Sequence, residues 1–121
     1  VILVGRNNRQ NDLVTFKHAQ PRDLWFHTKD IPGSHVVLRS QGAAPLLPDI
    51  EKAAHLAAWF SKARNSANIP VDYTERRYVK KPSGAKPGFV IYEKQKTLRM
   101  TPSETEINEL LQGGIKPSVP Q

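Results

Sequence analysis

The residue types best suited to chemistry gather in one short stretch, DLWFHTKDIPGSHVVLRS, which covers residues 23–40 of this 121-residue chain. His27 and His35 stand with Asp30 around a Pro-Gly turn, and imidazoles with carboxylates can ligate a divalent metal, so a metal-dependent hydrolase is one hypothesis. The spacing lacks a His-Glu-x-x-His pattern and offers no third firm ligand. Ser34 lacks the glycine-flanked setting of a nucleophilic serine. We therefore expect no metal and no catalytic residue here.

The same stretch predicts two strands, at 24–28 and 35–39, joined by a turn. Because side chains alternate along a strand, Leu24 and Val36 are expected to point toward a core. The opposite face would then be exposed and would gather aromatic, imidazole and cationic groups: Trp25, His27, Lys29, His35 and Arg39. Such a face could contact a large charged partner.

Positive charge is concentrated in one part of the chain. The formal net charge is +7, and residues 61–100 alone carry ten lysines and arginines against three acids. A concentrated positive charge is typical of proteins that bind a phosphate backbone. A solvated basic face is the plainer alternative. We favour RNA or another polyanion as the partner.

Within that segment, the loop KKPSGAKPG at residues 80–88 combines glycines with Lys80, Lys81 and Lys86. Exposed backbone amides beside lysines can cradle phosphate. The loop is not a Walker A loop, which would need a different glycine spacing and a following helix, because FVIY follows here. Nucleotide hydrolysis is therefore not expected. An ordinary basic hairpin loop fits these residues equally well.

Composition narrows the remaining options. Without cysteine the chain can form neither a disulfide nor a zinc–thiolate site, and its apolar runs are too short to span a bilayer. The chain opens inside a predicted strand without a signal pattern, so we expect a cytoplasmic piece of a longer protein. Four aromatic residues could stack on unpaired bases, namely Trp25, Tyr73, Tyr78 and Tyr92. The phenylalanines are expected in the core: Phe16, Phe26, Phe60 and Phe89.

Several elements must position these groups, beginning with a buried strand at residues 1–5. Asn11 or Asp12 could cap a short helix carrying Leu13 and Phe16, with a strand through the same residues as the alternative. The principal helix is expected after Pro48, from about residue 49 to residue 65 or 66. Its polar face would expose Glu51, His55, Lys62 and Asn65.

The second half of the chain predicts strands at 71–80 and 89–100, the latter folded by a turn at 93–96. Ser103 is expected to cap a last helix that ends at Leu111, with Glu106 as its capping-box partner. Together the elements predict a single α+β domain over residues 1–112, followed by a flexible tail at 113–121. The sheet should be mainly antiparallel, with one principal helix packed on it and short accessory helices.

Four separated motifs resemble, in order, the C-terminal R module of the NFACT family, once called fibronectin-binding-protein-like. They are RNNRQND at 6–12, DLWFHTKDIPGSHVV at 23–37, FSKARNS at 60–66 with VDY at 71–73, and YVKKPSGAKPGFVIYEKQKTL at 78–98. The similarity extends from about Val4 to Thr101. The motifs are close to those of the bacterial type of the family.

The resemblance implies a role in ribosome-associated quality control. Such proteins bind the obstructed large ribosomal subunit and tRNA, and in bacteria they recruit alanyl-tRNA for template-free alanine tailing of the stalled peptide. The resemblance also implies other modules in the full protein, and the residues tied to elongation lie mainly there. We therefore expect a binding domain without enzymatic activity or cofactor. A domain that docks on the N-terminal module or on a matrix protein is the alternative.

The candidate site residues combine the family motifs with the basic positions. The expected RNA-binding residues are Arg6, Asn7, Asn8, Trp25, His27, Lys29, His35, Arg39, Lys62, Arg64, Arg76, Arg77, Lys80, Lys81 and Lys86. A second group of motif residues is expected to hold the fold: Asn11, Asp23, Asp30, Gly33 and Ser34. The expected partners are tRNA, large-subunit RNA and other modules of the same protein, with no membrane.

Overall fold

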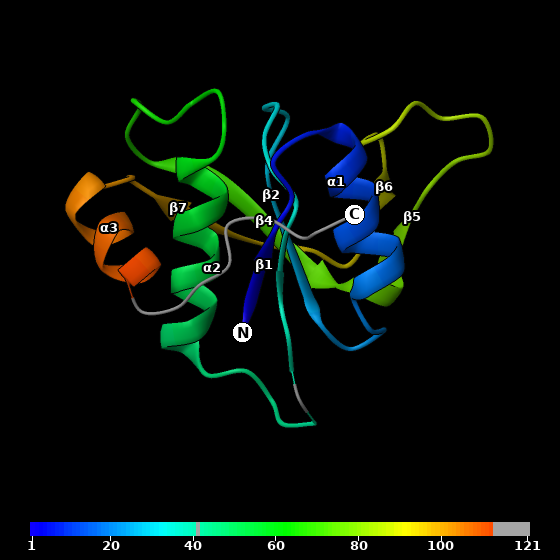
Figure 1. Cartoon of the computed structure of the whole chain (residues 1–121), viewed down its shortest axis with the longest axis horizontal. Helices are drawn as coiled ribbons and strands as arrows, with labels where there is room; N and C mark the ends of the chain where they lie inside the picture. Colours follow the sequence, from blue (N-terminus) through cyan, green and yellow to red (C-terminus); the bar gives the residue numbers. More distant parts are fainter. Residues whose placement is uncertain (41, 113–121) are drawn as a thin grey trace.

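The computed structural model describes residues 1–40 and 42–112, and the predicted tail at 113–121 lies outside them. It confirms an α+β fold in which a five-stranded antiparallel sheet carries α2 on one face (Figure 1). In chain order the elements are β1 (Ile2–Val4), α1 (Asn8–Asp12), the π-helical turn η1 (Leu13–His18), β2 (Leu24–Thr28), β3 (Val36–Leu38), α2 (Leu47–Trp59), β4 (Ile69–Glu75), the 3-10 turn η2 (Arg76–Tyr78), β5 (Val79–Lys80), β6 (Ile91–Tyr92), β7 (Lys96–Met100) and α3 (Glu104–Gln112).

The strand order of the sheet is β1-β3-β2-β4-β7, with every neighbouring pair antiparallel. The predicted hairpin of β2 and β3 forms the centre, with Trp25 paired to Val37 and Phe26 paired to Val36. Extending that register by one pair brings the imidazoles of His27 and His35 close together, with their ring centres 5.4 Å apart. The predicted hairpin is therefore confirmed, with its second strand shortened to Val36–Leu38.

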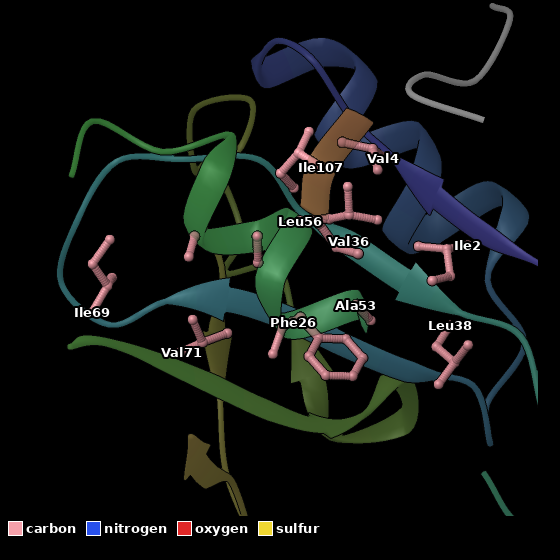
Figure 2. Close-up of a cluster of buried hydrophobic side chains, with 13 residues drawn as sticks. Ile2, Val4, Phe26, Val36, Leu38, Ala53, Leu56, Ile69, Val71 and Ile107 are labelled. Carbon is pink, nitrogen blue, oxygen red and sulfur yellow. The ribbon is translucent and has the colours of Figure 1, made fainter. Parts of the chain in front are cut away.

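Helix α2 buries one face of the sheet through small residues. Its alanines at 53, 54, 57 and 58 are buried, so the helix backbone can approach the strands closely. Figure 2 shows Leu56 and Ala53 of this helix over Phe26, Val36 and Val71 of the sheet, with Ile107 of α3 completing the cluster.

Helix α2 is shorter than predicted, because it ends at Trp59 instead of residue 65 or 66. The Phe60 carbonyl accepts a hydrogen bond of 2.9 Å from the Ser34 amide, and Ser61 forms a bridge with Gly33. The chain therefore leaves the helix to pair with the hairpin turn. This long-range pairing outweighs the local helical pattern beyond residue 60.

The other face of the sheet is also covered, so the predicted exposed face is wrong. Trp25 and Val37 are buried with Leu3, Val14 and Val79 under α1, η1 and the β5–β6 pair. The cap prediction is wrong as well, because Asn7 caps α1, accepting from the Gln10 amide at 2.8 Å. Because α1 begins at residue 8, the η1 turn that follows it lies across the hairpin.

Hydrogen bonds join the buried polar groups of this second face. Trp25 Nε1 donates to Thr15 Oγ1 at 3.1 Å, and the same hydroxyl lies 2.9 Å from His35 Nδ1. Tyr92 and Thr97 both donate to the buried Asp72 carboxylate, at 2.6 and 2.7 Å. Because these partners satisfy the buried polar atoms of Trp25, His35 and Asp72, they stabilise one specific packing of the hairpin under its cover.

The strand predictions in the second half need two corrections. Residues 71–80 break into β4, the η2 turn and β5, and residues 89–100 break into β6 and β7. Strand β6 pairs with β5 while β7 pairs with β4, so the turn at 93–96 joins two sheets instead of one hairpin. Lys94 takes a φ of 59° in this turn, where the chain changes direction between the two sheets.

Ser103 caps α3 as predicted, since its Oγ accepts from the Glu106 amide at 3.4 Å. The Glu106 side chain does not accept the capping-box hydrogen bond from the Ser103 amide. Instead His55 lies between them, with Nε2 accepting from the Ser103 amide at 3.0 Å and Nδ1 3.0 Å from the Glu106 carboxylate. His55, predicted to be exposed, is therefore buried and ties α2 to α3.

Replacing Asn11 by alanine should lower the free energy of unfolding by about 1–3 kcal/mol. The buried Asn11 carboxamide accepts from the His35 amide at 2.9 Å, and its loss leaves that buried N–H without a partner. Urea denaturation measures the change. The matched control is Asn65→Ala at an exposed position, and equal stabilities for the two variants would contradict the assignment.

Acidification below pH 6.5 should destabilise the domain through its buried imidazoles. Burial, assisted by His27, lowers the pKa of His35 to about 3, and burial also lowers the pKa of His27 and His55. A lowered histidine pKa contributes stability that is present above 6.5 and is lost as the pH falls toward the folded value, at up to about 1.4 kcal/mol per pH unit for one group.

Urea unfolding curves between pH 7 and pH 4 test this expectation. His35→Gln should flatten the profile, whereas Asn65→Ala, at an exposed position without a titrating side chain, should leave its slope as in the parent chain. A parent profile that is flat from pH 6.5 to 4 would contradict the expected titration.

Candidate nucleic-acid interface

Four segments that are distant in the sequence meet along one edge of the domain, the upper edge in Figure 1. We call it the loop edge and define it as residues 5–12, 29–34, 60–66 and 81–89. Hydrogen bonds join the second and third segments, because the Lys62 amide donates to the Pro32 carbonyl at 2.9 Å beside the Gly33–Ser61 bridge.

The first segment is joined to the others through side chains. Asn11 donates to the Gly33 carbonyl at 3.4 Å, and Asp12 accepts from the Gly88 amide at 3.0 Å. Gly88 has a φ of 85°, and a Cβ there would lie 2.7 Å from Asn8 Oδ1, so a side chain at this position would clash with α1. The four segments therefore form one continuous surface.

An open groove of about 350 Å³ runs between the first three segments. None of its described lining residues is acidic, and three are cationic: Arg6, Asn7, Asn8, Asn11, Pro32, Gly33, Ser34, Phe60, Ser61, Lys62 and Arg64. Amide side chains and glycine backbone complete a lining suited to phosphate and sugar oxygens.

The groove cations are held in place by aromatic rings. The Arg6 guanidinium lies 4.3 Å from the centre of the Phe60 ring, and the Arg64 guanidinium lies 4.2 Å from that of Trp59. Arg64 also donates through Nε to the Trp59 carbonyl at 3.0 Å. Within the described ranges, neither Arg6, Arg64 nor Lys62 forms an ion pair with an acidic side chain. These charges are therefore positioned but not neutralised.

The fourth segment carries one lysine that holds the loop and one that faces solvent. Lys81 Nζ lies 3.2 Å from the Asp12 carboxylate and donates to the carbonyls of Lys86 and Phe89 at 2.7 and 3.2 Å. The Lys86 side chain is exposed, as is Lys80 on β5. Lys81 thus shapes the loop that presents Lys86.

The structure gathers about half of the predicted RNA-binding residues at the loop edge. These are Arg6, Asn7, Asn8, Lys29, Lys62, Arg64, Lys81 and Lys86. Arg9 on α1, which sequence reasoning did not single out, is exposed at the same edge and continues the basic surface.

Three predicted cations lie at the opposite end of the sheet, so residues 61–100 do not form one basic surface. The Arg76 and Arg77 amides bond to the carbonyls of Asp23 and Pro21, and the Arg39 amide bonds to that of Val1. Arg76 donates through Nε to the Thr15 carbonyl, and burial lowers its pKa. Its guanidinium supports the fold instead of facing a ligand.

Of the three aromatic or imidazole residues expected on the exposed face, two are buried. Trp25 is 0% exposed and His35 is 2% exposed, so neither ring can meet a base in this structure. His27 is partly buried and stacks on Trp25 with ring centres 5.9 Å apart. Burial lowers the pKa of His27, while the nearby Asp72 opposes that shift.

The residues expected to hold the fold are mostly bonded to backbone. Asp23 accepts from the Gln20 and Ser40 amides at 2.8 and 3.0 Å, and Ser34 is buried at the bridge to α2. Asp30 takes a φ of 54° in the hairpin turn and is exposed. A Cβ on Gly33 would lie 2.9 Å from that of Ser61, so this glycine permits the close contact of two loops.

Among residues 1–40 and 42–112, no three histidine or acidic side chains gather closely enough to hold a metal ion. His27, Asp30 and His35 belong to one hairpin, but His35 is directed into the interior toward Thr15. In the same part of the chain, no helix is long and apolar enough to cross a membrane.

One predicted core phenylalanine, Phe89, is instead 57% exposed beside the basic loop. Phe60 is partly buried against the core, and its ring also lines the groove beneath Arg6. The lysines that precede Phe89 in the sequence could have indicated its exposed position. A prediction from the pattern of apolar residues alone does not take these lysines into account.

Comparison with known proteins identifies close relatives. The chain is 55% identical over 109 residues to "Rqc2 homolog RqcH" of Bacillus subtilis and 54% identical over 113 residues to that of Streptococcus suis, covering 90% and 91% of this chain. It spans only about a fifth of those relatives, 19% and 20% of their lengths.

A more distant relative and a solved structure extend the comparison. "Coiled-coil domain-containing protein 25" of Mus musculus is 31% identical over 117 residues, which is 91% of this chain and 55% of that protein. The solved structure titled "The structure of the C-terminal of the fibronectin/fibrinogen-binding protein from Streptococcus suis (FBPS)" matches with a TM-score of 0.85 and 55% identity, over 89% of this chain and 43% of that one.

The profile of the family described as "NFACT protein RNA binding domain" matches residues 1–94, most of the chain. The resemblance carried by the four sequence motifs is thereby confirmed. This chain belongs to the NFACT RNA-binding domain family.

Proposed function

We propose that this domain binds RNA through the loop edge, as a module of a ribosome-associated quality control factor. The observation that carries the proposal is the groove lined by Arg6, Lys62 and Arg64, in which no described lining residue is acidic. Cations from separate segments converge there without acidic partners, which favours a ligand that brings its own negative charge.

The groove suits backbone contact better than base reading. Its arginines are held over aromatic rings, so they lose little freedom when they meet a phosphate. Asn7 and Asn8 at its rim can donate to phosphate or sugar oxygens. We therefore propose recognition of RNA by shape and backbone, with exposed Lys86 extending the contact along the loop edge.

The finer assignment rests on the relatives named "Rqc2 homolog RqcH". We propose that the partners are the obstructed large ribosomal subunit and tRNA, alanyl-tRNA in bacteria, in the cytoplasm. The domain would support template-free alanine tailing by binding, while the reaction itself would need the rest of a longer protein. Crosslinking of the domain to large subunits with bound tRNA, mapped to residues, tests this assignment.

A protein-docking role is the second candidate, and one observation favours it. At the end of the sheet opposite the loop edge, a cavity of about 590 Å³ is lined by Val1, Leu46 and other residues, and both of these side chains are exposed. Another module of the same protein or a matrix protein could cover this surface. A pull-down with the N-terminal module of a relative distinguishes this role from RNA binding.

Reversing two groove charges, Lys62→Glu with Arg64→Glu, should weaken RNA binding by at least about tenfold and lower the salt slope by about two phosphate contacts. Fluorescence anisotropy with labelled tRNA over a salt series measures both quantities. The matched control is Lys17→Glu with Arg22→Glu, which changes the net charge equally at exposed positions away from the groove. Equal losses for both double variants would contradict a localised site.

Lys86 and Lys81 should separate binding from folding. Lys86→Ala removes an exposed charge, so it should weaken RNA binding and leave the free energy of unfolding within about 0.5 kcal/mol. Lys81→Ala breaks the contacts to Asp12 and two loop carbonyls, so it should lower that free energy by about 1–3 kcal/mol. Urea denaturation and RNA anisotropy of both variants check this, and the reverse pattern would overturn the assignment.

A further inference from the structure

The outer face of the β5–β6 pair exposes large apolar side chains beside lysines. Phe89 is 57% and Ile91 53% exposed, whereas the alternating Val90 and Tyr92 pack on the second core. Exposed Lys80 pairs with Ile91 across the two strands, so the two side chains share this outer face. An aromatic ring thus stands among positive charges instead of in the core.

Phe89 is held in this exposed position by the structure of its loop. Its amide donates to the Lys86 carbonyl at 3.1 Å, and its carbonyl accepts from Lys81 Nζ at 3.2 Å. The preceding Gly88 is fixed by the hydrogen bond from its amide to Asp12. Because the backbone is bonded on both sides, little ordering is needed when the ring meets a ligand.

We propose that Phe89 stacks on an unpaired RNA base while Lys80 and Lys86 meet the adjacent phosphates. The inference rests on the proposed RNA binding and adds a requirement for an unpaired base, since a blunt duplex offers no free base face along its length. Charge complementarity favours this occupant, because exposed Phe89 belongs to the basic loop edge, follows exposed Lys86 in the same loop and precedes Ile91, the partner of exposed Lys80. Aromatic stacking with flanking cations is a common way to bind single-stranded nucleic acid.

The test compares two RNA probes with a common stem, one carrying a uridine loop and one closed as a blunt duplex. Phe89→Ala should weaken binding of the looped RNA by about 5- to 100-fold and leave duplex binding unchanged. Phe89→Leu should behave like Phe89→Ala, whereas Phe89→Trp should retain binding. Leu46→Ala, at another exposed apolar position, is the matched control and should bind both probes normally.

A second readout locates the contact. With 5-iodouridine in the loop, ultraviolet crosslinking of the 121-residue chain should place the adduct at Phe89 by mass spectrometry. If the unmodified chain binds neither probe, the proposed RNA binding itself fails. If it binds both and Phe89→Ala changes neither affinity, or lowers the two equally, stacking is overturned while RNA binding stands. If Phe89→Ala abolishes capture of the N-terminal module of a relative in the pull-down while RNA binding is unchanged, this face is assigned to protein docking instead.

Discussion

The Asn11 carboxamide joins the first helix to the central hairpin, and much of the loop edge depends on it. It accepts from the His35 amide and donates to the Gly33 carbonyl, and a Cβ on Gly5 would lie within 2.8 Å of its backbone. These contacts position the hairpin turn against α1. Gly33 of this turn forms a bridge with Ser61, and this pairing places Lys62 and Arg64 beside Arg6. A buried amide thus determines where exposed charges meet.

Two histidines, His35 of the hairpin motif and His55 of α2, belong to the interior more than to a ligand surface. His35 lies beside Thr15 under η1, and His55 joins α2 to the start of α3. Neutral imidazoles serve these places because one ring nitrogen can accept while the other donates. The motif that first suggested metal chemistry is therefore largely a set of hydrogen bonds that fasten a covered hairpin.

The proposed function follows from how the fold distributes charge. Positive residues only five positions apart in the sequence lie at opposite ends of the sheet, as Arg76 and Lys81 show. Others that are more than fifty residues apart, such as Arg6 and Lys62, come to line one groove. Aromatic rings under the arginines then fix their directions. The surface offers a phosphate backbone several preplaced contacts, and Phe89 adds one for a base.

Local patterns determined the fold class, the central hairpin, the cap at Ser103 and the family, because alternation, turn residues and motif order are properties of short segments. Only the tertiary structure decided that Trp25 lies inside, that α2 ends at Trp59 and that Phe89 is exposed. Each of these depends on what a distant segment covers or pairs with. The alternating residue pattern of a strand is the same whether its second face is exposed to water or covered by a helix. The covering segment takes its place only when the chain folds.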